Sequence, residues 1–346
     1  MIGMEKHPTG DGRNLDPARA DEHGEGALID VRVPDIAWPI APEAHPAPAR
    51  VPSETYYDLP VIKAPPWRWF VPAYFHMGGM AGAASSLAAA VQLSRRNTAL
   101  ERKLHWISLI GEASGGLLLI ADLGRPGRFF NMLRVFRPTS PMNMGTWILS
   151  AAGTTTGLSL LASLRGRKSR PSVVGVIGAV AGTALSTYTG VLLGNTAVPV
   201  WKSTRRHLPP WFAALSAASL ASVLELGGAD APLVRRYSIV AKSAALVAGR
   251  AVARAADRDG VGAPLRDSGL ALASRWLGIA SLVATAWPGA SRRRTRIAGA
   301  LGTAAALLAR FAIVQAGRAS ASDPRATFAP QRRERSDAHE ARRTRP

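Results

Sequence analysis

The sequence predicts an all-α integral membrane protein, a polytopic bundle of about eight transmembrane helices between flexible polar N- and C-terminal tails. Three observations support this fold class. The chain of 346 residues is 47% hydrophobic, and its charges avoid several long stretches between residues 67 and 317. Each stretch is close to the length of about 20 apolar residues that a helix needs to cross a bilayer. Most arginines in this region stand in short clusters at the ends of these stretches, where side chains meet lipid headgroups.

The chain is expected to divide into three regions. Residues 1–66 are rich in Pro, Ala, Gly and charge, and bury too little apolar surface to offset the entropy cost of ordering. Residues 67–317 are expected to form the transmembrane bundle, and residues 318–346 a basic, disordered tail. Residues 1–50 lack the basic start, apolar run and cleavage site of a signal peptide. We therefore expect membrane insertion to begin with the first span.

Four spans are strongly indicated. The first, Phe70–Leu93, has 24 residues without charge, and at about 1.5 Å per residue it exceeds the roughly 30 Å of hydrocarbon in a bilayer. The second, Leu104–Ala121, is interrupted only by Glu112. The third, Pro141–Leu164, and the fourth, Pro171–Trp201, are uncharged throughout. The fourth has 31 residues, so we expect it to tilt or to end in a non-helical stretch near its last proline.

Four weaker spans carry charged residues. They are expected at residues 209–229, 236–254, 270–288 and 297–317, and contain Glu225, Lys242, Arg250, Arg275 and Arg310. A charge in the membrane interior costs at least about 2.5 kcal/mol unless it faces a partner, a cavity or an interface. Glu112 and Glu225 are therefore expected either to pair with these basic residues or to form part of a proton path. The remaining basic side chains are expected to reach the interfaces.

Glycines recur four residues apart in the predicted spans. The pairs are Gly78 and Gly82, Gly111 and Gly115, Gly153 and Gly157, Gly178 and Gly182, and Gly190 and Gly194. In lipid, such pairs let two helix backbones approach closely and pack by dispersion. They predict a close-packed bundle rather than a water-filled pore.

Composition excludes several classes of site. The chain has no cysteine, so it cannot hold a disulfide, an iron-sulfur cluster or a Cys-ligated zinc ion. His105 begins the second span on the opposite face from His76, so no histidine pair at one depth is available for haem. We expect no metal site. The net charge of +20 does not indicate nucleic-acid binding, because the arginines flank apolar runs.

Because successive spans cross the membrane in opposite directions, four span ends lie at one membrane face. They are the start of the first span, the end of the second, the start of the third and the end of the fourth. The residues expected there are Trp67, Trp69, Tyr74, His76, Asp122, Arg125, Ser140, Met142, Asn195 and Trp201. Tyr188 lies about 20 Å back from Trp201 along the fourth span. We predict a polar-aromatic rim that docks a soluble partner and admits an amphipathic ligand. The alternative is a structural turn whose arginines bind headgroups.

His76 and Tyr188 are candidates for contact with a quinone. A neutral imidazole can donate to a carbonyl oxygen and relay a proton, and a phenol can donate its hydroxyl. The alternative for each is ordinary packing, with a hydrogen bond to a neighbouring backbone group.

Three stretches together resemble the NrfD-like family of polysulfide-reductase membrane subunits. They are "YYDLPVIKAPPWRWFVPAYFHMGGMAG", "LLLIADLGRPGRFFNMLRVFRPTSPMNMGTW" and "YTGVLLGNTAVPVW", which lie within residues 56–201. The resemblance implies a multi-pass subunit of the plasma or inner membrane that binds menaquinone or ubiquinone. It also implies that the chain exchanges electrons with a four-cluster, ferredoxin-like iron-sulfur subunit, which serves a molybdopterin oxidoreductase subunit. Such membrane subunits carry no redox metal of their own.

The resemblance also implies roles for individual residues. Tyr74 stands where related subunits place a quinone-contacting histidine, and Tyr188 stands at their quinone-contacting tyrosine. His76 is displaced by two positions, which turns a helical side chain by about 200°, so either Tyr74 or His76 would serve, with Asn195 nearby. Asp58 and Leu59 stand where the family commonly has a Gly-Arg pair, so the sequence departs from the family pattern there. The residues expected to form the docking and entrance loop are Asp122, Arg125, Arg128, Ser140 and Met142.

The leading prediction is therefore the quinone-binding membrane subunit of an oxidoreductase complex, not an enzyme by itself. One alternative is a proton-translocating module in which Glu112, Asp122 and Glu225 form the path. Another is a plain membrane anchor or a transporter without quinone chemistry of its own.

Overall fold

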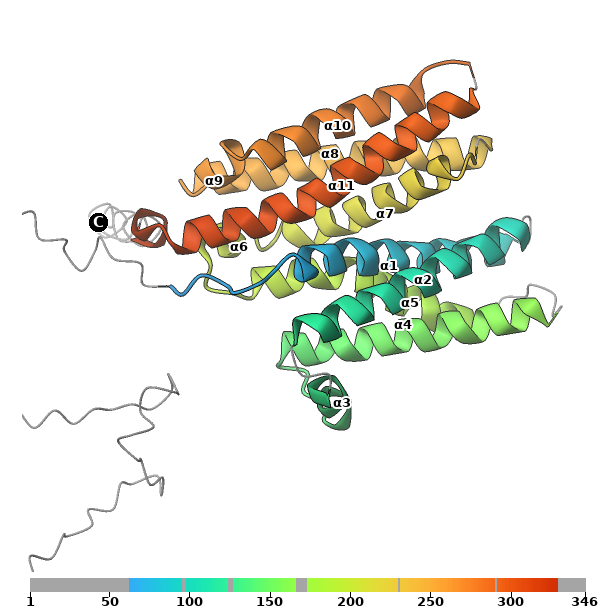
Figure 1. Cartoon of the computed structure of the whole chain (residues 1–346), viewed down its shortest axis with the longest axis horizontal. Coiled ribbons are helices and arrows are strands. Elements are labelled where there is room, and N and C mark those ends of the chain that lie inside the picture. The colour runs from blue at the N-terminus through green and yellow to red at the C-terminus, as the bar shows by residue number, and fades with distance from the viewer. Residues whose placement is uncertain are drawn as a thin grey trace, which may run out of the picture. The chain divides into compact units, whose positions relative to one another are not determined.

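The computed structural model describes residues 62–94, 98–123, 127–165, 173–229, 231–289 and 291–328. All regular secondary structure within these ranges is helical (Figure 1). Eight helices have 18 or more residues: α1 (Phe70–Ser94), α2 (Thr98–Asp122), α4 (Pro141–Leu164), α5 (Val173–Gly194), α7 (Leu208–Leu226), α8 (Pro232–Arg258), α10 (Gly269–Ala286) and α11 (Arg292–Ala321). Shorter helices are α3 (Gly127–Arg134), α6 (Pro199–Ser203) and α9 (Ala263–Arg266), and residues 324–328, which were expected to belong to a disordered tail, are also helical.

The predicted all-α membrane bundle is confirmed. Each of the eight predicted spans overlaps one long helix. Five of these helices, α2, α4, α5, α10 and α11, are long and apolar enough to cross a membrane by length and composition. α11 continues to Ala321, beyond the boundary at residue 317 that hydropathy indicates. The predictions made for residues 1–61 and 329–346 lie outside the described residues.

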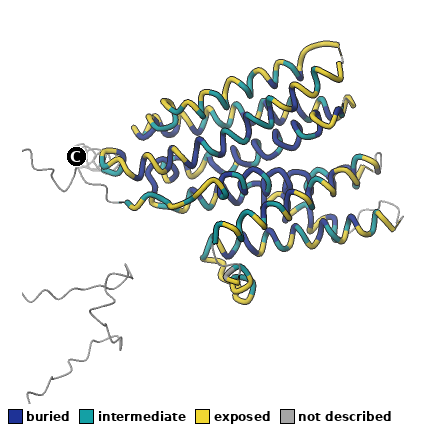
Figure 2. Tube along the Cα trace, in the orientation of Figure 1, coloured by how far each residue is buried: buried dark blue, intermediate teal, exposed yellow. Residues whose placement is uncertain are grey.

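The long helices form two groups of four that meet along a central seam (Figure 1). The first group is α1, α2, α4 and α5, and the second is α7, α8, α10 and α11. Contacts of α1 and α5 with α7, and of α1 with α11, join the groups. Buried residues concentrate on α1, α7 and α11, whereas α4 and α10 are more exposed (Figure 2). The seam is therefore the core of the bundle.

Glycine allows α1 and α5 to cross closely. A Cβ added at Gly82 would overlap the backbone of Gly182, and the reverse also holds. Next to this contact the Ser85 hydroxyl donates to the Gly178 carbonyl over 3.0 Å. These glycines therefore make the close approach predicted from their spacing. Gly157 departs from that prediction, because no atom lies within 4 Å of where its Cβ would be.

The predicted fourth span ends early. α5 stops at Gly194, and Pro199 begins the separate helix α6 at a position where the missing N–H costs nothing. The residues between them are not helical, as expected from the prolines and from the excess length.

Aromatic rings join the two groups at the α6 end of the seam. The indole of Trp67 stacks on that of Trp201, with centroids 5.1 Å apart, and also meets the edge of Phe75. Phe75 in turn contacts Phe212 of α7, with centroids 5.9 Å apart. Trp201 is fully buried and its indole N–H donates to the Ile313 carbonyl over 2.9 Å. Sequence reasoning placed Trp201 on a rim, but it lies in the core because α6 folds it inward against α11.

Candidate functional site

The four predicted span ends lie at one end of the bundle (Figure 1). Two contacts establish this arrangement. Tyr188 of α5 packs against Gly145 in the second turn of α4, and Trp67, just before α1, stacks on Trp201 just after α5. The common end therefore follows from the alternating directions of the helices, as the sequence predicted.

Tyr74 and Tyr188 come together inside the first group. Tyr74 is 3% exposed, and its ring lies against Gly78 of its own helix and Gly115 of α2. Tyr188 is 8% exposed, and a side chain at Gly145 would overlap its phenol. The two phenols lie near each other, but no ring contact or hydrogen bond joins them within the described ranges. Within the described ranges, neither hydroxyl has a hydrogen-bond partner, so both remain available to donate.

His76 lies on the other side of α1 from Tyr74. It is 5% exposed, and it faces Arg310 of α11 rather than α2. Its Nδ1 atom has no hydrogen-bond partner among the described residues. The two-residue offset thus separates the two side chains as helical geometry requires. Of the two candidates in α1, the structure brings only Tyr74 to Tyr188.

Arg310 is fully buried in the seam. Its guanidinium carbon lies 4.0 Å from the centre of the Phe212 ring. The Nη2 atom donates to the Phe212 carbonyl over 3.0 Å and to the Ser216 hydroxyl over 2.9 Å. Nε and Nη1 have no partner in the described structure. Arg310 is therefore held by a ring and by neutral acceptors, and not by either of the glutamates that sequence reasoning offered.

Glu112 faces α4. Its Oε1 atom accepts from the Ser108 hydroxyl over 3.0 Å and from the Thr156 hydroxyl over 3.3 Å. Its Oε2 atom has no partner among the described residues. No basic residue is hydrogen-bonded to this carboxyl group in the described ranges.

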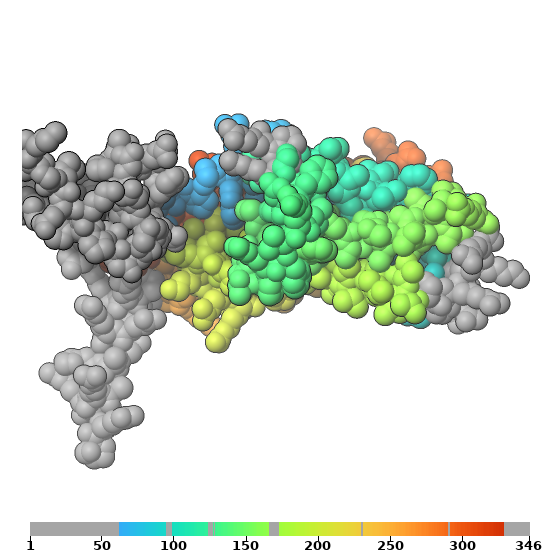
Figure 3. Space-filling view, turned by 90° about the horizontal axis from the view of Figure 1, so that it is seen from below, coloured from blue at the N-terminus to red at the C-terminus, as the bar shows by residue number. Residues whose placement is uncertain are grey.

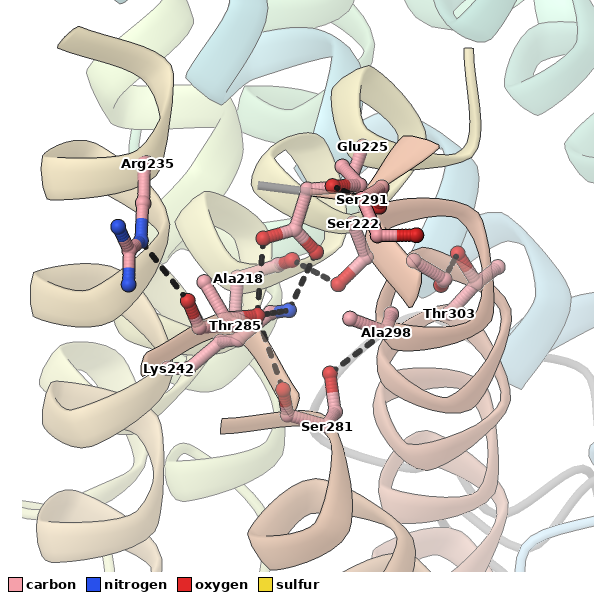
Figure 4. Close-up of polar contacts among 12 residues, drawn as sticks. Ala218, Ser222, Glu225, Arg235, Lys242, Ser281, Thr285, Ser291, Ala298 and Thr303 are labelled. Carbon is pink, nitrogen blue, oxygen red and sulfur yellow. Dashed lines mark hydrogen bonds and ion pairs between the residues drawn. The ribbon is translucent and has the colours of Figure 1, made fainter. Parts of the chain in front are cut away.

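Glu225 forms a buried network in the second group (Figure 4). Its Oε2 atom lies 2.5 Å from Nζ of Lys242, and its Oε1 atom accepts from the Thr285 hydroxyl over 2.9 Å. Lys242 also donates to Thr285 over 2.8 Å. One of the pairings left open by the sequence is therefore present. Glu112 and Glu225 contact different helices, so the structure does not bring the two predicted proton-path carboxylates together.

Arg235 anchors the end of α10 beside this network. Its guanidinium donates to the carbonyls of Thr285, Ala286 and Trp287 over 2.9 to 3.0 Å. These carbonyls belong to the last turn and C-cap of the helix, where they lack intrahelical partners. Sequence reasoning missed Arg235 and Thr285, because an arginine at a span end and a threonine in an apolar run have no distinctive spacing.

The predicted entrance loop contains a helix. α3 occupies residues that sequence reasoning treated as a connector, and it lies on the outer face of the bundle (Figure 3). α3 is strongly amphipathic, so it can pack its apolar face against the N-terminal end of α4. Asp122 is partly exposed and lies near Arg68. Arg125 and the side chain of Arg128 lie outside the described residues.

Ser140, Met142 and Asn195 lie at the same end. Ser140 caps α4 by accepting from the Asn143 backbone N–H over 3.4 Å. Met142 is 47% exposed. Asn195 is exposed just after α5, about 10 Å along the helix from Tyr188, so it lies apart from the two phenols.

Asn143 attaches α3 to α4, a role that sequence reasoning missed. Its amide nitrogen donates to the carbonyls of Met132 and Val135 over 2.6 and 2.9 Å. Its amide oxygen accepts from the Arg137 backbone N–H over 2.7 Å. This buried side chain satisfies three backbone groups around the end of α3, because an amide both donates and accepts. The sequence signal that could have indicated this role is a polar asparagine near the start of an otherwise apolar span.

These features define a multi-pass helical membrane protein with buried ionisable residues and without cysteine. Among the described residues, no cluster of His, Asp or Glu is arranged to hold a metal ion.

A family model described as polysulfide reductase, NrfD_2, matches residues 53–322. The chain therefore belongs to the NrfD-type polysulfide reductase family of membrane subunits. The resemblance carried by residues 56–201 is confirmed, and the family match extends through all eight long helices. No curated protein matches the chain in sequence.

Proposed function

We propose that this chain, a membrane subunit of a polysulfide-reductase-type complex, binds quinone or quinol at Tyr74 and Tyr188. It would exchange two electrons and two protons per quinone turnover, with the electrons passing to or from an iron-sulfur subunit. That subunit would in turn serve a molybdopterin subunit. The observation that carries the proposal is the pair of buried phenols, whose hydroxyls have no partner among the described residues.

The two phenols are held in place by glycines. Gly78 and Gly115 lie against the ring of Tyr74, and Gly145 lies against the phenol of Tyr188, where a larger side chain would overlap it. A phenol hydroxyl can donate to a quinone carbonyl oxygen, and it can pass a proton when that oxygen becomes basic on reduction. The apolar wall strengthens such hydrogen bonds by excluding water. The quinone supplies the redox chemistry, and the protein orients it.

The surface around α3 supports docking of a soluble subunit. Phe130, Phe136 and Met142 are 63%, 60% and 47% exposed, and Arg134 and Arg137 lie among them. Aromatic residues, methionine and arginine are the types enriched in protein interfaces. This patch lies at the Tyr188 end of the bundle, so a partner bound here would bring its cluster near the phenols.

The test compares Tyr188→Phe and Tyr74→Phe with wild type in the membrane-bound complex, with quinol oxidation or quinone reduction as the readout. Loss of one hydrogen bond is expected to reduce turnover roughly two- to tenfold per hydroxyl. Tyr237→Phe, a change in the second group, serves as the control. Turnover of the soluble subunits with an artificial electron carrier should be unchanged. Wild-type quinone turnover in both variants would exclude the phenols from the site.

The same preparation distinguishes the alternative functions. A plain anchor would show no quinone-linked turnover in the wild-type complex. A proton-translocating module would lose proton movement in Glu225→Gln or Glu112→Gln while quinone turnover persists.

A further inference from the structure

A cavity of about 570 Å³ lies inside the second group, away from Tyr74 and Tyr188. Its lining residues come from α7, α8, α9, α10 and α11 and the residues joining them. The volume falls within the range of about 300–1,000 Å³ that is usual for ligand sites. A site of this size is distinct from the quinone site proposed above, which lies in the first group.

The cavity is long and mainly apolar. Along α8 its lining extends from Lys242 to Asp257, which corresponds to about 22 Å of helix. Trp211, Leu246 and Ile279 are among the side chains of its wall. One leaflet of a bilayer has about 15 Å of hydrocarbon, half of the roughly 30 Å total. The cavity is therefore long enough to receive an acyl chain.

One end of the cavity offers no free positive charge. Lys242 lies there, but its ammonium group is bonded to Glu225 and Thr285 (Figure 4). Ser222 and Ser281 also line this end, and their hydroxyls donate to the carbonyls of Ala218 and Ala298 over 2.8 and 2.7 Å. An anionic group at this end would lack a donor that is not already engaged.

Two cations available to a ligand lie near the middle of the cavity. Arg250 of α8 and Arg275 of α10 both line the cavity and are exposed. Within the described ranges, neither guanidinium has a hydrogen bond or an ion pair. A third lining residue, Arg266, is already near Asp257, at 3.5 Å. Arg250 is about 12 Å along α8 from Lys242 and about 10 Å from Asp257, so the two free guanidinium groups lie near the middle of the cavity wall.

From these two arginines the cavity continues toward α9, at one end of the bundle. Arg250 precedes the end of α8 by about 12 Å, and Arg275 follows the start of α10 by about 9 Å. Asp259, just after α8, accepts from the Ser203 hydroxyl of α6 over 2.6 Å. The half of the cavity between the arginines and α9 is therefore on the same side of the bundle as α6, the side toward which these long side chains can extend.

We propose that the cavity binds an anionic phospholipid. One acyl chain lies in the part of the cavity between the arginines and Lys242, and Arg250 and Arg275 hold the phosphate. Guanidinium groups match phosphate oxygens through paired N–H donors, and basic pockets between membrane helices bind anionic headgroups. A quinone headgroup is neutral and would leave both charges uncompensated. A free phosphate ion would leave the apolar length unfilled.

The lipid would complete the contact between α8 and α10. Arg235 and Lys242 hydrogen-bond to residues 285–287, at one end of this helix pair. Among the described residues, no hydrogen bond joins α8 residues 245–257 to α10 residues 271–281. An acyl chain along this stretch would supply packing that the side chains alone do not.

The test uses the full-length chain in its complex, stripped of lipid in detergent and then given phosphatidylglycerol or phosphatidylcholine with identical acyl chains. Native mass spectrometry counts the lipid retained. Wild type should retain phosphatidylglycerol at least about tenfold better than phosphatidylcholine, because two arginines favour the net negative headgroup. The double variant Arg250→Gln/Arg275→Gln should lose this preference. Arg254→Gln, an exposed change on the same helix outside the cavity, should keep it.

Further measurements separate the other occupants. Ala309→Phe, which projects into the cavity, should reduce retention of both lipids while the arginines remain. Inorganic phosphate should not displace phosphatidylglycerol. Equal retention of the two lipids by wild type, or an unchanged preference in the double arginine variant, would overturn the proposal. Displacement of phosphatidylglycerol by menaquinone would also overturn it and would assign the cavity to quinone. If Ala309→Phe fails to fold, the exposed arginine variant decides the question.

Discussion

The ammonium group of Lys242 lies 2.5 Å from the carboxyl group of Glu225, and the two side chains are 4% and 2% exposed. Such a buried pair is stable only if each charge remains compensated. Thr285 supplies the additional hydrogen bonds, donating to Glu225 and accepting from Lys242. The pair therefore joins α7, α8 and α10 at one point.

Removing one member of this pair should cost more than removing both. Lys242→Met leaves the Glu225 carboxyl group without its cation, and we expect a loss of about 3–5 kcal/mol in the free energy of unfolding. Glu225→Gln/Lys242→Met should lose much less. Denaturant titration in detergent measures both values, with Lys202→Met, an exposed change on α6, as the control. Equal losses in the single and double variants would show that the ion pair does not stabilise the fold.

Two glycine substitutions should have opposite effects. Gly82→Ala places a Cβ against the backbone of α5, so we expect about 1–3 kcal/mol of destabilisation from overpacking. Gly157→Ala places its Cβ in open space and should stabilise α4 by up to about 1 kcal/mol through helix propensity. Thermal unfolding in one detergent compares them directly. Similar behaviour of the two variants would contradict the close crossing of α1 and α5.

Loss of the Asn143 side chain should release α3. Asn143→Ala removes three hydrogen bonds and leaves backbone groups near the end of α3 without partners. We expect faster hydrogen exchange and proteolysis in residues 127–140, with the long helices unchanged. Binding of the proposed soluble subunits should also weaken, since the docking surface proposed above includes this segment. Asn195→Ala is the control, and equal protection of residues 127–140 in both variants would count against the role of Asn143.

Arg310 provides a test of whether a buried charge serves function or stability. Arg310→Met removes an unpaired cation from the seam, so we expect stability equal to or greater than wild type by about 1–4 kcal/mol. We also expect quinone-linked turnover to fall, since ionisable residues inside the membrane are usually retained for function. Parallel unfolding and turnover assays separate the two effects. Lower stability with full turnover would identify Arg310 as a structural anchor on Phe212.

Much of the architecture could be predicted from hydropathy and direction alone. Runs of apolar residues located the eight long helices, and their alternation placed the ends of α1, α2, α4 and α5 together. The motifs in residues 56–201 identified the family, which the match over residues 53–322 confirms. These features depend on residues that are close together in the sequence, so one sequence is enough to predict them.

The arrangement of the site depended on contacts between distant residues. Sequence spacing could not show that His76 lies on the side of Arg310 and Tyr74 on the side of Tyr188, because helix rotation within the bundle decides which neighbour each side chain faces. Nor could it choose Lys242 among four basic candidates for Glu225. The cavity is lined by residues of α7, α8, α9, α10 and α11 that are far apart in the sequence, so no local pattern indicates it.

The position of Trp201 limits how the bundle can move. Its indole is clamped between Trp67 and the Gly317 backbone turn, with its N–H on the Ile313 carbonyl. Transporters built from two bundles usually carry solutes by rocking one bundle against the other. Such rocking here would have to break the contacts of the buried Trp201 indole in every transport cycle. The contacts of Trp201 therefore fit a bundle that stays rigid while charge passes through it better than a bundle that opens and closes.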